Sequence, residues 1–335
     1  MKLTILTEDD CRELLGMREA IDVQAEAFTL LAAGRAVEGL RAVVNSEQPP
    51  GMAIFNPCFL RGGAGYGIKV VSDFFGNGAR GLPRMSAIIA LFDGASGMPR
   101  TLMEGGHVTD LRTGAGTALA ARHLARPESR VLGVVGAGRV AHNQVEALAS
   151  AFALDSVRLF GRTPARAQAL AADFRRKAPL ERVRIDCVDS AEAAVRDADI
   201  VVAATTSSEP VLRGEWLRPG AFVAAVGAYA ADSRELDDAA IRRAGRHVID
   251  SRKDCLERAG DFVMPMRAGI LQREQVAEIA EVLSGTRPGR VSADEIIVYK
   301  SSGVPIQDLV TAQHIERRAA ARGLGQVVDL GGDHD

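Results

Sequence analysis

One segment, Val131 to Ala149 (VLGVVGAGRVAHNQVEALA), limits the possible folds of this chain more than any other. An apolar run predicts a buried strand, a glycine-containing turn follows at once, and helical periodicity begins directly behind the turn. The turn has the GxGxxA spacing of the dinucleotide-binding fingerprint, in which the first glycine makes a tight turn and the second lets a pyrophosphate approach the backbone. The helix then presents unpaired N–H groups to phosphate. We therefore expect a Rossmann domain whose coenzyme site includes Gly136, Ala137, Gly138, Arg139 and Val140.

Strands and helices alternate from Val131 onward. The apolar runs that predict strands are VLGVVG, VRLFG, RVRIDCV, DIVVAATT, AFVAAVG, RHVID and EIIVYKS. Nearly continuous apolar runs separated by helices indicate a parallel sheet that is covered on both faces. The predicted fold class is α/β, with a Rossmann dinucleotide-binding domain over residues 115–303. The strand ends add Thr205, Thr206, Val226 and Ser301 to the expected coenzyme site.

The first 114 residues have a different pattern. A short strand near residues 3–6 precedes two helices, the second over residues 17–33, and the β-like runs RAVVN, YGIKVVS, MSAIIALFD and PRTLME follow. Glycine-bearing breaks between these runs indicate a mixed or antiparallel sheet. The last helical pattern, PIQDLVTAQHIERRAAARG, follows the Rossmann strands and is predicted to leave their sheet. We expect residues 1–114 and 304–335 to form a second domain, of the α+β class.

Charge and cysteine usage narrow the classes of function. The chain has 335 residues and a net charge of −2, so no basic excess indicates nucleic-acid binding. It has no run of about 18 apolar residues, which argues against a membrane span. The four cysteines lack CxxC spacing and the six histidines lack ligand spacing, so we expect no metal site and reduced thiols. Reduced thiols and an N-terminus unlike a signal peptide predict a cytoplasmic protein.

The end of the second Rossmann strand carries a basic residue where many dinucleotide-binding proteins carry an acidic one. VRLFGRTPARAQAL runs from an apolar strand into Gly161, Arg162 and Thr163. An acidic residue here binds the ribose 2′-hydroxyl of NAD(H), whereas a guanidinium and a hydroxyl match the 2′-phosphate of NADP(H). We interpret these three residues as coenzyme ligands and predict NADP(H) over NAD(H). The alternative is that Arg162 is a solvated residue at a strand end.

Five further segments carry a more specific signal. They are GIKVVS (67–72), GLPRMSAIIALFDGASGMP (81–99), TDLRTGAGTALAARHLARP (109–127), TSSEPVLRGEWLRPGAFVAAVGAYAADSRELDD (206–238) and YKSSGVPIQDLVTA (299–312). In order and spacing, over nearly the whole chain, they resemble the ornithine cyclodeaminase/mu-crystallin family. The resemblance implies a homodimer joined through the non-Rossmann domain, which also binds the substrate. It further implies an active site between the two domains that acts on the α-carbon of amino or imino acids.

The resemblance also assigns site residues. It places Arg112 and Thr113 against the coenzyme phosphates, and it implies that Arg41 and Lys69 bind the substrate carboxylate. The chemistry fits, because a guanidinium binds a carboxylate through two hydrogen bonds and a lysine can supply a proton to an imine. The alternative for Arg41 and Lys69 is a position that faces water. Asp308, in the opening turn of the last helix, is interpreted as a helix cap in preference to an active-site residue.

Position 229 separates the branches of the family. True cyclodeaminases resemble GADxPGKxEL, with an aspartate six residues before the glutamate, and that aspartate is given the acid–base role in ammonia loss. Here Tyr229 stands at that distance from Glu235. A tyrosine is protonated at neutral pH and cannot replace a carboxylate base, although it can donate to a substrate or simply line the pocket. The surrounding segment, and the GRT at residues 161–163, are closer to mu-crystallin and its ketimine-reductase-like relatives, which favour NADPH.

These observations predict an NADPH-dependent reductase of a small α-imino acid, such as Δ1-pyrroline-2-carboxylate or Δ1-piperideine-2-carboxylate. The catalytic candidates are Lys69, Arg41 and Tyr229. Three alternatives remain: a dehydrogenase of alanine or of an N-substituted amino acid, a cyclodeaminase of ornithine or lysine, and a non-catalytic NADPH-dependent ligand-binding protein. Tyr229 argues against the cyclodeaminase, and Arg41 with Lys69 argues against the non-catalytic protein.

Overall fold

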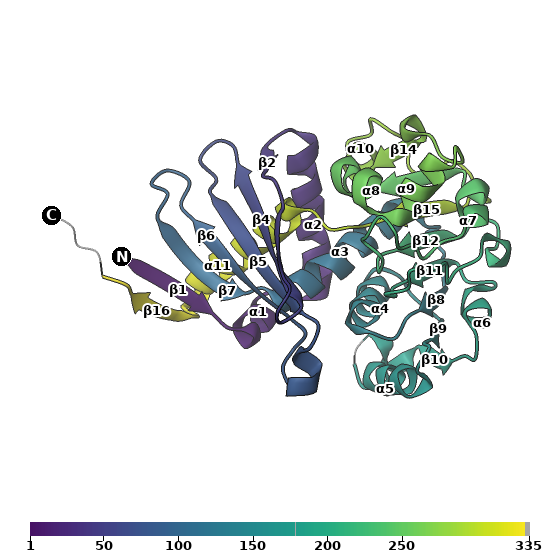
Figure 1. The fold of residues 1–335 in the computed structure, drawn as a ribbon, viewed down its shortest axis with the longest axis horizontal. Coiled ribbons are helices and arrows are strands. Elements are labelled where there is room, and N and C mark those ends of the chain that lie inside the picture. Colours follow the sequence, from purple (N-terminus) through teal and green to yellow (C-terminus); the bar gives the residue numbers. More distant parts are fainter. Residues whose placement is uncertain (178, 332–335) are drawn as a thin grey trace. The chain divides into compact units, whose positions relative to one another are not determined.

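The computed structural model describes residues 1–177 and 179–331, and it divides into two compact units. The first unit contains Met1–Arg112 and Pro305–Asp335, and the second contains Thr113–Val304 (Figure 1). Residues 332–335, the end of the predicted α+β domain, lie outside the described residues. Each unit combines helices with one sheet, and the predicted α/β class with a Rossmann domain is confirmed.

The first unit is built on an eight-stranded sheet with the order β16-β1-β7-β6-β5-β4-β2, in which β3 also pairs with β4. Neighbouring strands are antiparallel except β1 and β7, which are parallel. The strands are Lys2–Leu6 (β1), Ala36–Glu38 (β2), Ala42–Ser46 (β3), Gly51–Leu60 (β4), Tyr66–Phe74 (β5), Met85–Phe92 (β6), Pro99–Glu104 (β7) and Gln326–Asp329 (β16). The predicted mixed or antiparallel sheet is therefore confirmed.

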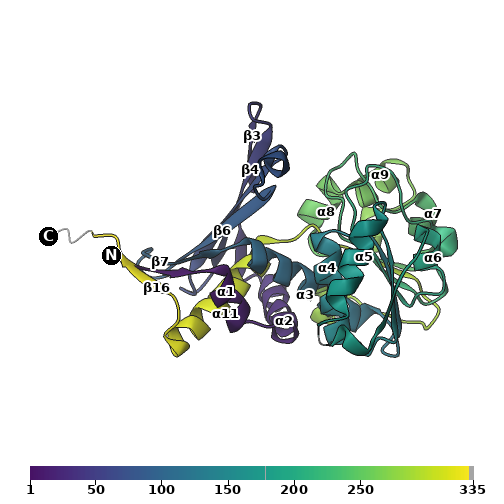
Figure 2. The same ribbon diagram turned by 90° about the horizontal axis from the view of Figure 1, so that it is seen from below.

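Three helices cover one face of this sheet, as Figures 1 and 2 show: Glu8–Leu14 (α1), Met17–Ala32 (α2) and Pro305–Arg322 (α11). Strand β5 shows how the pattern of residues creates two faces. Burial alternates along it, so that Lys69 and Val71 are buried while Ile68 and Val70 on the opposite face are only partly covered. Successive side chains of a strand point to opposite faces, and only the face toward α11 has a helical layer. The other face of the sheet therefore keeps apolar side chains partly exposed.

Strand β4 was not predicted from the sequence, although its residues 51–59 pair with β5. The reason is Pro57 in the middle of the run GMAIFNPCFL, because a proline usually argues against a central strand. The structure accommodates it at a gap in the pairing. Strand β3 pairs with β4 at residues 51–55 and β2 pairs with it at residues 58–60, so neither strand needs an N–H from Pro57.

The second unit is built on a parallel sheet with the order β10-β9-β8-β11-β12-β15-β13-β14. Its strands are Val131–Val135 (β8), Ser156–Phe160 (β9), Arg184–Cys187 (β10), Ile200–Ala203 (β11), Phe222–Ala225 (β12), Arg246–Ile249 (β13), Val276–Glu278 (β14) and Ile297–Lys300 (β15). Seven of these were predicted, and the short β14 was not. The order of the strands along the sheet reverses at β8, whose neighbours are β9 and β11. In sheets of this kind, ligands bind where the order reverses, outside the carboxyl ends of the strands.

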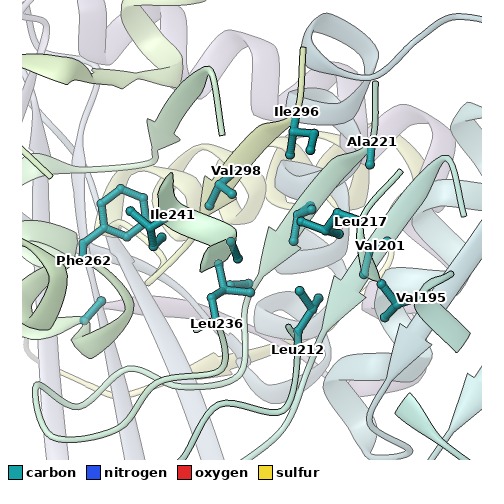
Figure 3. Close-up of a cluster of buried hydrophobic side chains, with 14 of the residues drawn as sticks. Val195, Val201, Leu212, Leu217, Ala221, Leu236, Ile241, Phe262, Ile296 and Val298 are labelled. Atoms are coloured by element: carbon teal, nitrogen blue, oxygen red, sulfur yellow. The ribbon is translucent and has the colours of Figure 1, made fainter. Parts of the chain in front are cut away.

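The helices of the second unit lie on both faces of its sheet (Figure 1). They are Arg139–Ala151 (α4), Pro164–Phe174 (α5), Ala191–Val195 (α6), Asp238–Arg243 (α7), Arg252–Arg258 (α8), Gly260–Arg267 (α9) and Ile279–Leu283 (α10), while α3 (Gly106–Leu124) starts in the first unit and ends in the second. Figure 3 shows part of the core, where Val201, Leu212 and Ile241 belong to one buried cluster. Within the described residues, no helix combines the length and the apolar character that a bilayer crossing needs.

Candidate active site

A hollow of about 250 Å³ lies at the carboxyl ends of β8, β9 and β11. Gly136 makes the turn after β8 with φ of +127°, a conformation that L side chains rarely adopt, and a Cβ there would collide with the carbonyl of Ala204. A Cβ on Gly161 would come within 2.7 Å of the Ala137 Cβ. The sequence therefore needs glycine at both positions to keep the strand ends together. The hollow, the turn and the N-terminus of α4 fit the pyrophosphate and ribose of a dinucleotide.

The hollow gathers eight of the predicted coenzyme residues. They are Gly136, Ala137, Gly138, Gly161, Arg162, Thr163, Thr205 and Thr206. The others are placed around it or elsewhere: Arg139 and Val140 begin α4, the Val226 N–H donates to the carbonyl of Ala203, and the Ser301 hydroxyl donates to Asp250. Thr113 lies within α3.

The ribose end of the hollow is basic. Arg162 and Thr163 line it, as does Arg166, and none of its described lining residues is acidic. Thr163 is the N-cap of α5, and its side chain makes no capping hydrogen bond. Within the described residues, no ion pair holds either guanidinium. Arg166 was not predicted from the sequence, because it lies inside α5 whereas Arg162 precedes the N-cap, so helical periodicity does not relate the two residues.

A second cluster of charged side chains lies in the first unit, around Asp308. Its Oδ2 lies 2.7 Å from the Lys69 Nζ, and its Oδ1 accepts a 2.9 Å hydrogen bond from the Arg112 Nε. Lys69, Arg112 and Asp308 are all buried, at 4%, 7% and 4% exposure. They come from β5, α3 and α11, so three distant parts of the sequence supply them.

Arg41 reaches the same cluster through Asn56. Its Nε donates a 2.8 Å hydrogen bond to the Asn56 side chain, and Asn56 is the cross-strand partner of Lys69. The structure therefore brings together Arg41, Lys69 and Arg112. A carboxylate binds guanidinium and ammonium groups through charge-assisted hydrogen bonds, so these side chains can hold an anionic substrate.

The two partners in the ion pair have altered protonation equilibria. Burial, together with the charges of Arg112 and Arg41, lowers the pKa of Lys69 to about 8, although Asp308 acts in the opposite direction. Burial alone would raise the pKa of Asp308, but the charges of Arg112 and Lys69 outweigh it and lower that pKa. Asp308 therefore stays ionised, while Lys69 can release a proton near neutral pH.

The interpretation of Asp308 as a helix cap is wrong. Its carboxylate oxygens bind Lys69 and Arg112, and the Glu38 carboxylate accepts a hydrogen bond from Ile306 in the first turn of α11. The sequence could not separate the two roles, because an acidic residue in a first helical turn suits a cap in any helix. Tyr229, the third catalytic candidate, follows β12 in the second unit and is 58% exposed.

The whole chain resembles known enzymes. The model of the ornithine cyclodeaminase/mu-crystallin family matches residues 1–323. A Delta(1)-pyrroline-2-carboxylate reductase of Bacillus cereus is 30% identical over 98% of this chain and 100% of its own length. The Delta(1)-pyrroline-2-carboxylate reductase of Thermococcus litoralis, solved with NADH and L-proline, is 34% identical with a TM-score of 0.91, covering 96% of this chain and 99% of the other. An archaeal alanine dehydrogenase dimer with bound NAD is 30% identical with a TM-score of 0.91, covering 99% and 100%.

Proposed function

The chain belongs to the ornithine cyclodeaminase/mu-crystallin family, and we propose that it is an NAD(P)H-dependent reductase of a small α-imino acid. The favoured substrates are cyclic ketimines such as Δ1-pyrroline-2-carboxylate or Δ1-piperideine-2-carboxylate. The observation that carries the proposal is the placement of Arg41 and Arg112 beside the buried Lys69–Asp308 pair, in a chain that also has a dinucleotide cradle. Relatives named as reductases of pyrroline-2-carboxylate support the choice of substrate.

The chemistry needs one hydride and one proton. The reduced nicotinamide, when bound, supplies the hydride to the carbon of the C=N bond. Arg41 and Lys69 hold the substrate carboxylate, and the Lys69 ammonium donates a proton to the imine nitrogen, so that a C–H and an N–H bond replace the C=N double bond. Asp308 keeps Lys69 oriented through their 2.7 Å ion pair. We retain the prediction from the sequence that Tyr229 serves as a hydrogen-bond donor.

Initial rates of coenzyme oxidation test this function. We expect rapid turnover with Δ1-pyrroline-2-carboxylate or Δ1-piperideine-2-carboxylate, and no turnover of ornithine or lysine to ammonia. The alanine dehydrogenase relative makes pyruvate with ammonia the necessary comparison. Faster turnover of that pair than of both cyclic imines would replace the proposal with an amino-acid dehydrogenase. No turnover of any of these substrates, despite coenzyme binding, would point to a ligand-binding protein.

A nicotinamide dinucleotide is the coenzyme, and we propose that NADP(H) is preferred over NAD(H). The support is the pair of guanidinium groups at the ribose end of the hollow, with the Thr163 hydroxyl beside them. Two related structures contain NADH or NAD, so the preference proposed here is a property of this chain's own residues. A 2′-phosphate would meet two cations, whereas the 2′-hydroxyl of NAD(H) would find no carboxylate among the described lining residues.

We also propose a homodimer formed through the open face of the first unit's sheet. Phe59, Tyr66 and Phe92 form a ladder of stacked rings across three strands, with centroid separations of 5.6 and 4.7 Å. Ile88, in register with Val70, continues the apolar surface at 48% exposure. A contiguous apolar surface of this kind usually marks an interface. A second copy is the favoured occupant because a related dehydrogenase is a dimer.

The dimer predicts a specific effect of charge on this face. Ile88→Glu should raise the dissociation constant by about 100-fold or more, because dimer formation would bury an unpaired carboxylate. Light scattering over a dilution series measures it. Val291→Glu is the control, since Val291 is 65% exposed but lies in the second unit, outside this sheet. A dimer that survives Ile88→Glu with unchanged affinity would contradict this interface.

A further inference from the structure

A buried carboxylate, Glu235, joins the ends of two neighbouring strands of the Rossmann sheet. Its Oε1 accepts hydrogen bonds from the Thr205 N–H at 2.6 Å and from the Thr205 hydroxyl at 2.9 Å, just after β11. Its Oε2 accepts from the N–H groups of Gly227 at 2.7 Å and Ala228 at 3.1 Å, just after β12. The side chain is completely buried. One carboxylate thus satisfies four donors at the carboxyl edge of the sheet.

A buried ion pair holds Glu235 and its neighbours from the other side. The Lys300 Nζ lies 2.9 Å from the Asp261 Oδ2, and both side chains have no exposed surface. The Asp261 Oδ1 accepts hydrogen bonds from the N–H groups of Glu235 and Leu236, at 2.7 and 2.9 Å. Lys300 also donates to the carbonyl of Ala228. Both sides of the Ala228 residue are therefore attached to buried charges, Glu235 at its N–H and Lys300 at its carbonyl.

This network contacts both the coenzyme hollow and the backbone next to Tyr229. Thr205 lines the hollow that fits the coenzyme, and Tyr229 directly follows Ala228. There is little space for adjustment, because a Cβ on Gly227 would collide with the Thr205 backbone and come within 2.6 Å of the Glu235 Oε1. The network, whose three charged side chains are fully buried, thus ends at one wall of the hollow and at the residue before Tyr229.

We propose that Glu235, held by the Lys300–Asp261 pair, is a positioning residue that sets the coenzyme-binding geometry at Thr205 and orients the backbone from which Tyr229 projects. Charge is essential to this role, because only a carboxylate offers acceptor oxygens to all four donors. A glutamine of the same size would turn an NH₂ group toward two of them. The part that concerns Tyr229 rests on the proposed function, whereas the part that concerns the coenzyme does not.

Glu235→Gln tests the proposal with a nearly isosteric change. We expect the dissociation constant of the reduced coenzyme, followed by its fluorescence without substrate, to rise about tenfold or more, as expected for a lost hydrogen bond to a charged group. We also expect kcat to fall, because the backbone before Tyr229 loses its anchor. Coenzyme affinity within about twofold of the parent protein, in a folded variant, would overturn the proposal.

Asp199→Asn is the matched control. The Asp199 carboxylate also accepts four hydrogen bonds, from Arg126, Arg218 and the N–H groups of Arg130 and Val131, but it lies immediately before β11 at the opposite edge of the sheet. A merely structural effect of losing a buried carboxylate would appear in both variants as a lower melting temperature. We expect only Glu235→Gln to change coenzyme affinity and kcat, and equal losses in both variants would overturn the positioning role.

Hydrogen exchange of the unaltered protein provides a test that requires no substitution. If Glu235 prepares the site in advance, the amides of Thr205, Gly227 and Ala228 should exchange as slowly as those of β11 and β12 before any coenzyme is added. Rapid exchange of these three amides, with protection appearing only after coenzyme binds, would show that the carboxylate does not preorganise the site. A protein that binds coenzyme in this way but reduces no imine would refute the proposed function and leave this inference standing.

Discussion

We expect Lys69→Met to lower kcat/KM for imine reduction by about 10³-fold, because a positioned proton donor contributes about 10²–10⁴-fold and the substrate carboxylate also loses a cation. The variant should fold, since Asp308 keeps its 2.9 Å hydrogen bond to Arg112 and is not left as an unpaired buried charge. Coenzyme affinity should change little, because Lys69 does not line the coenzyme hollow. Steady-state kinetics and coenzyme fluorescence measure the two effects separately.

The pH dependence gives this prediction a second readout. Lys69 is an ammonium below its pKa of about 8 and loses its proton above it. The value of kcat/KM for reduction should therefore be level below about pH 8 and fall about tenfold per unit above it, if the ammonium form is the proton donor. Lys69→Met should remove this alkaline limb. Lys177→Met, at an ion-paired lysine near the end of α5, is the control and should retain both rate and profile. Unchanged kinetics in Lys69→Met would exclude Lys69 from the chemistry.

The second large effect concerns coenzyme choice. We expect Arg162→Asp combined with Arg166→Asp to reduce the preference for NADPH over NADH by about 10²-fold or more, because hydrogen bonds to charged groups contribute about 1.5–3 kcal/mol each. The loss should lie in the KM or dissociation constant for NADPH, since the 2′-phosphate takes no part in hydride transfer. The NADPH affinity of the parent protein should also weaken as salt is added, and NADH affinity should respond less.

Each arginine can be tested alone, and the comparison shows whether Arg166 contributes. The control is Arg176→Asp, which makes the same change of charge just beyond the other end of α5, at a residue whose side chain is 72% exposed. It should leave the ratio of the two coenzymes unchanged. A parent protein that prefers NADH, or a double variant with an unaltered ratio, would contradict the proposed preference and leave the imine-reductase function intact.

Elements that depend on contiguous residues could be predicted from the sequence, whereas those that depend on distant segments could not. Strands β8 and β11 could be recognised because a fully buried parallel strand is an uninterrupted apolar run. Strand β4 escaped because Pro57 breaks its pattern, and only the gap between β2 and β3 explains why a proline fits there. Arg166 escaped because Arg162 precedes α5, so that only the folded hollow brings the two guanidinium groups together. Glu235 was noticed only as a marker for Tyr229, and its hydrogen bonds to two strand ends depend on their tertiary placement.

Contiguous residues determine the coenzyme turn, but they do not determine the protonation of the two buried lysines, Lys69 and Lys300. Local sequence was enough for the coenzyme turn, because the glycines, the strand before them and the helix after them are contiguous and each acts on the backbone nearby.

Lys69 and Lys300 both lie in apolar strands and look alike in the sequence. Folding places Lys69 near Arg112 and Arg41 as well as Asp308, and burial together with the two guanidinium groups lowers its pKa to about 8. Burial would lower the pKa of Lys300 too, but Asp261 and Glu235 outweigh it and raise that pKa. Whether a buried lysine releases its proton depends on the charges that distant segments bring to it, and only the tertiary structure decides which segments those are.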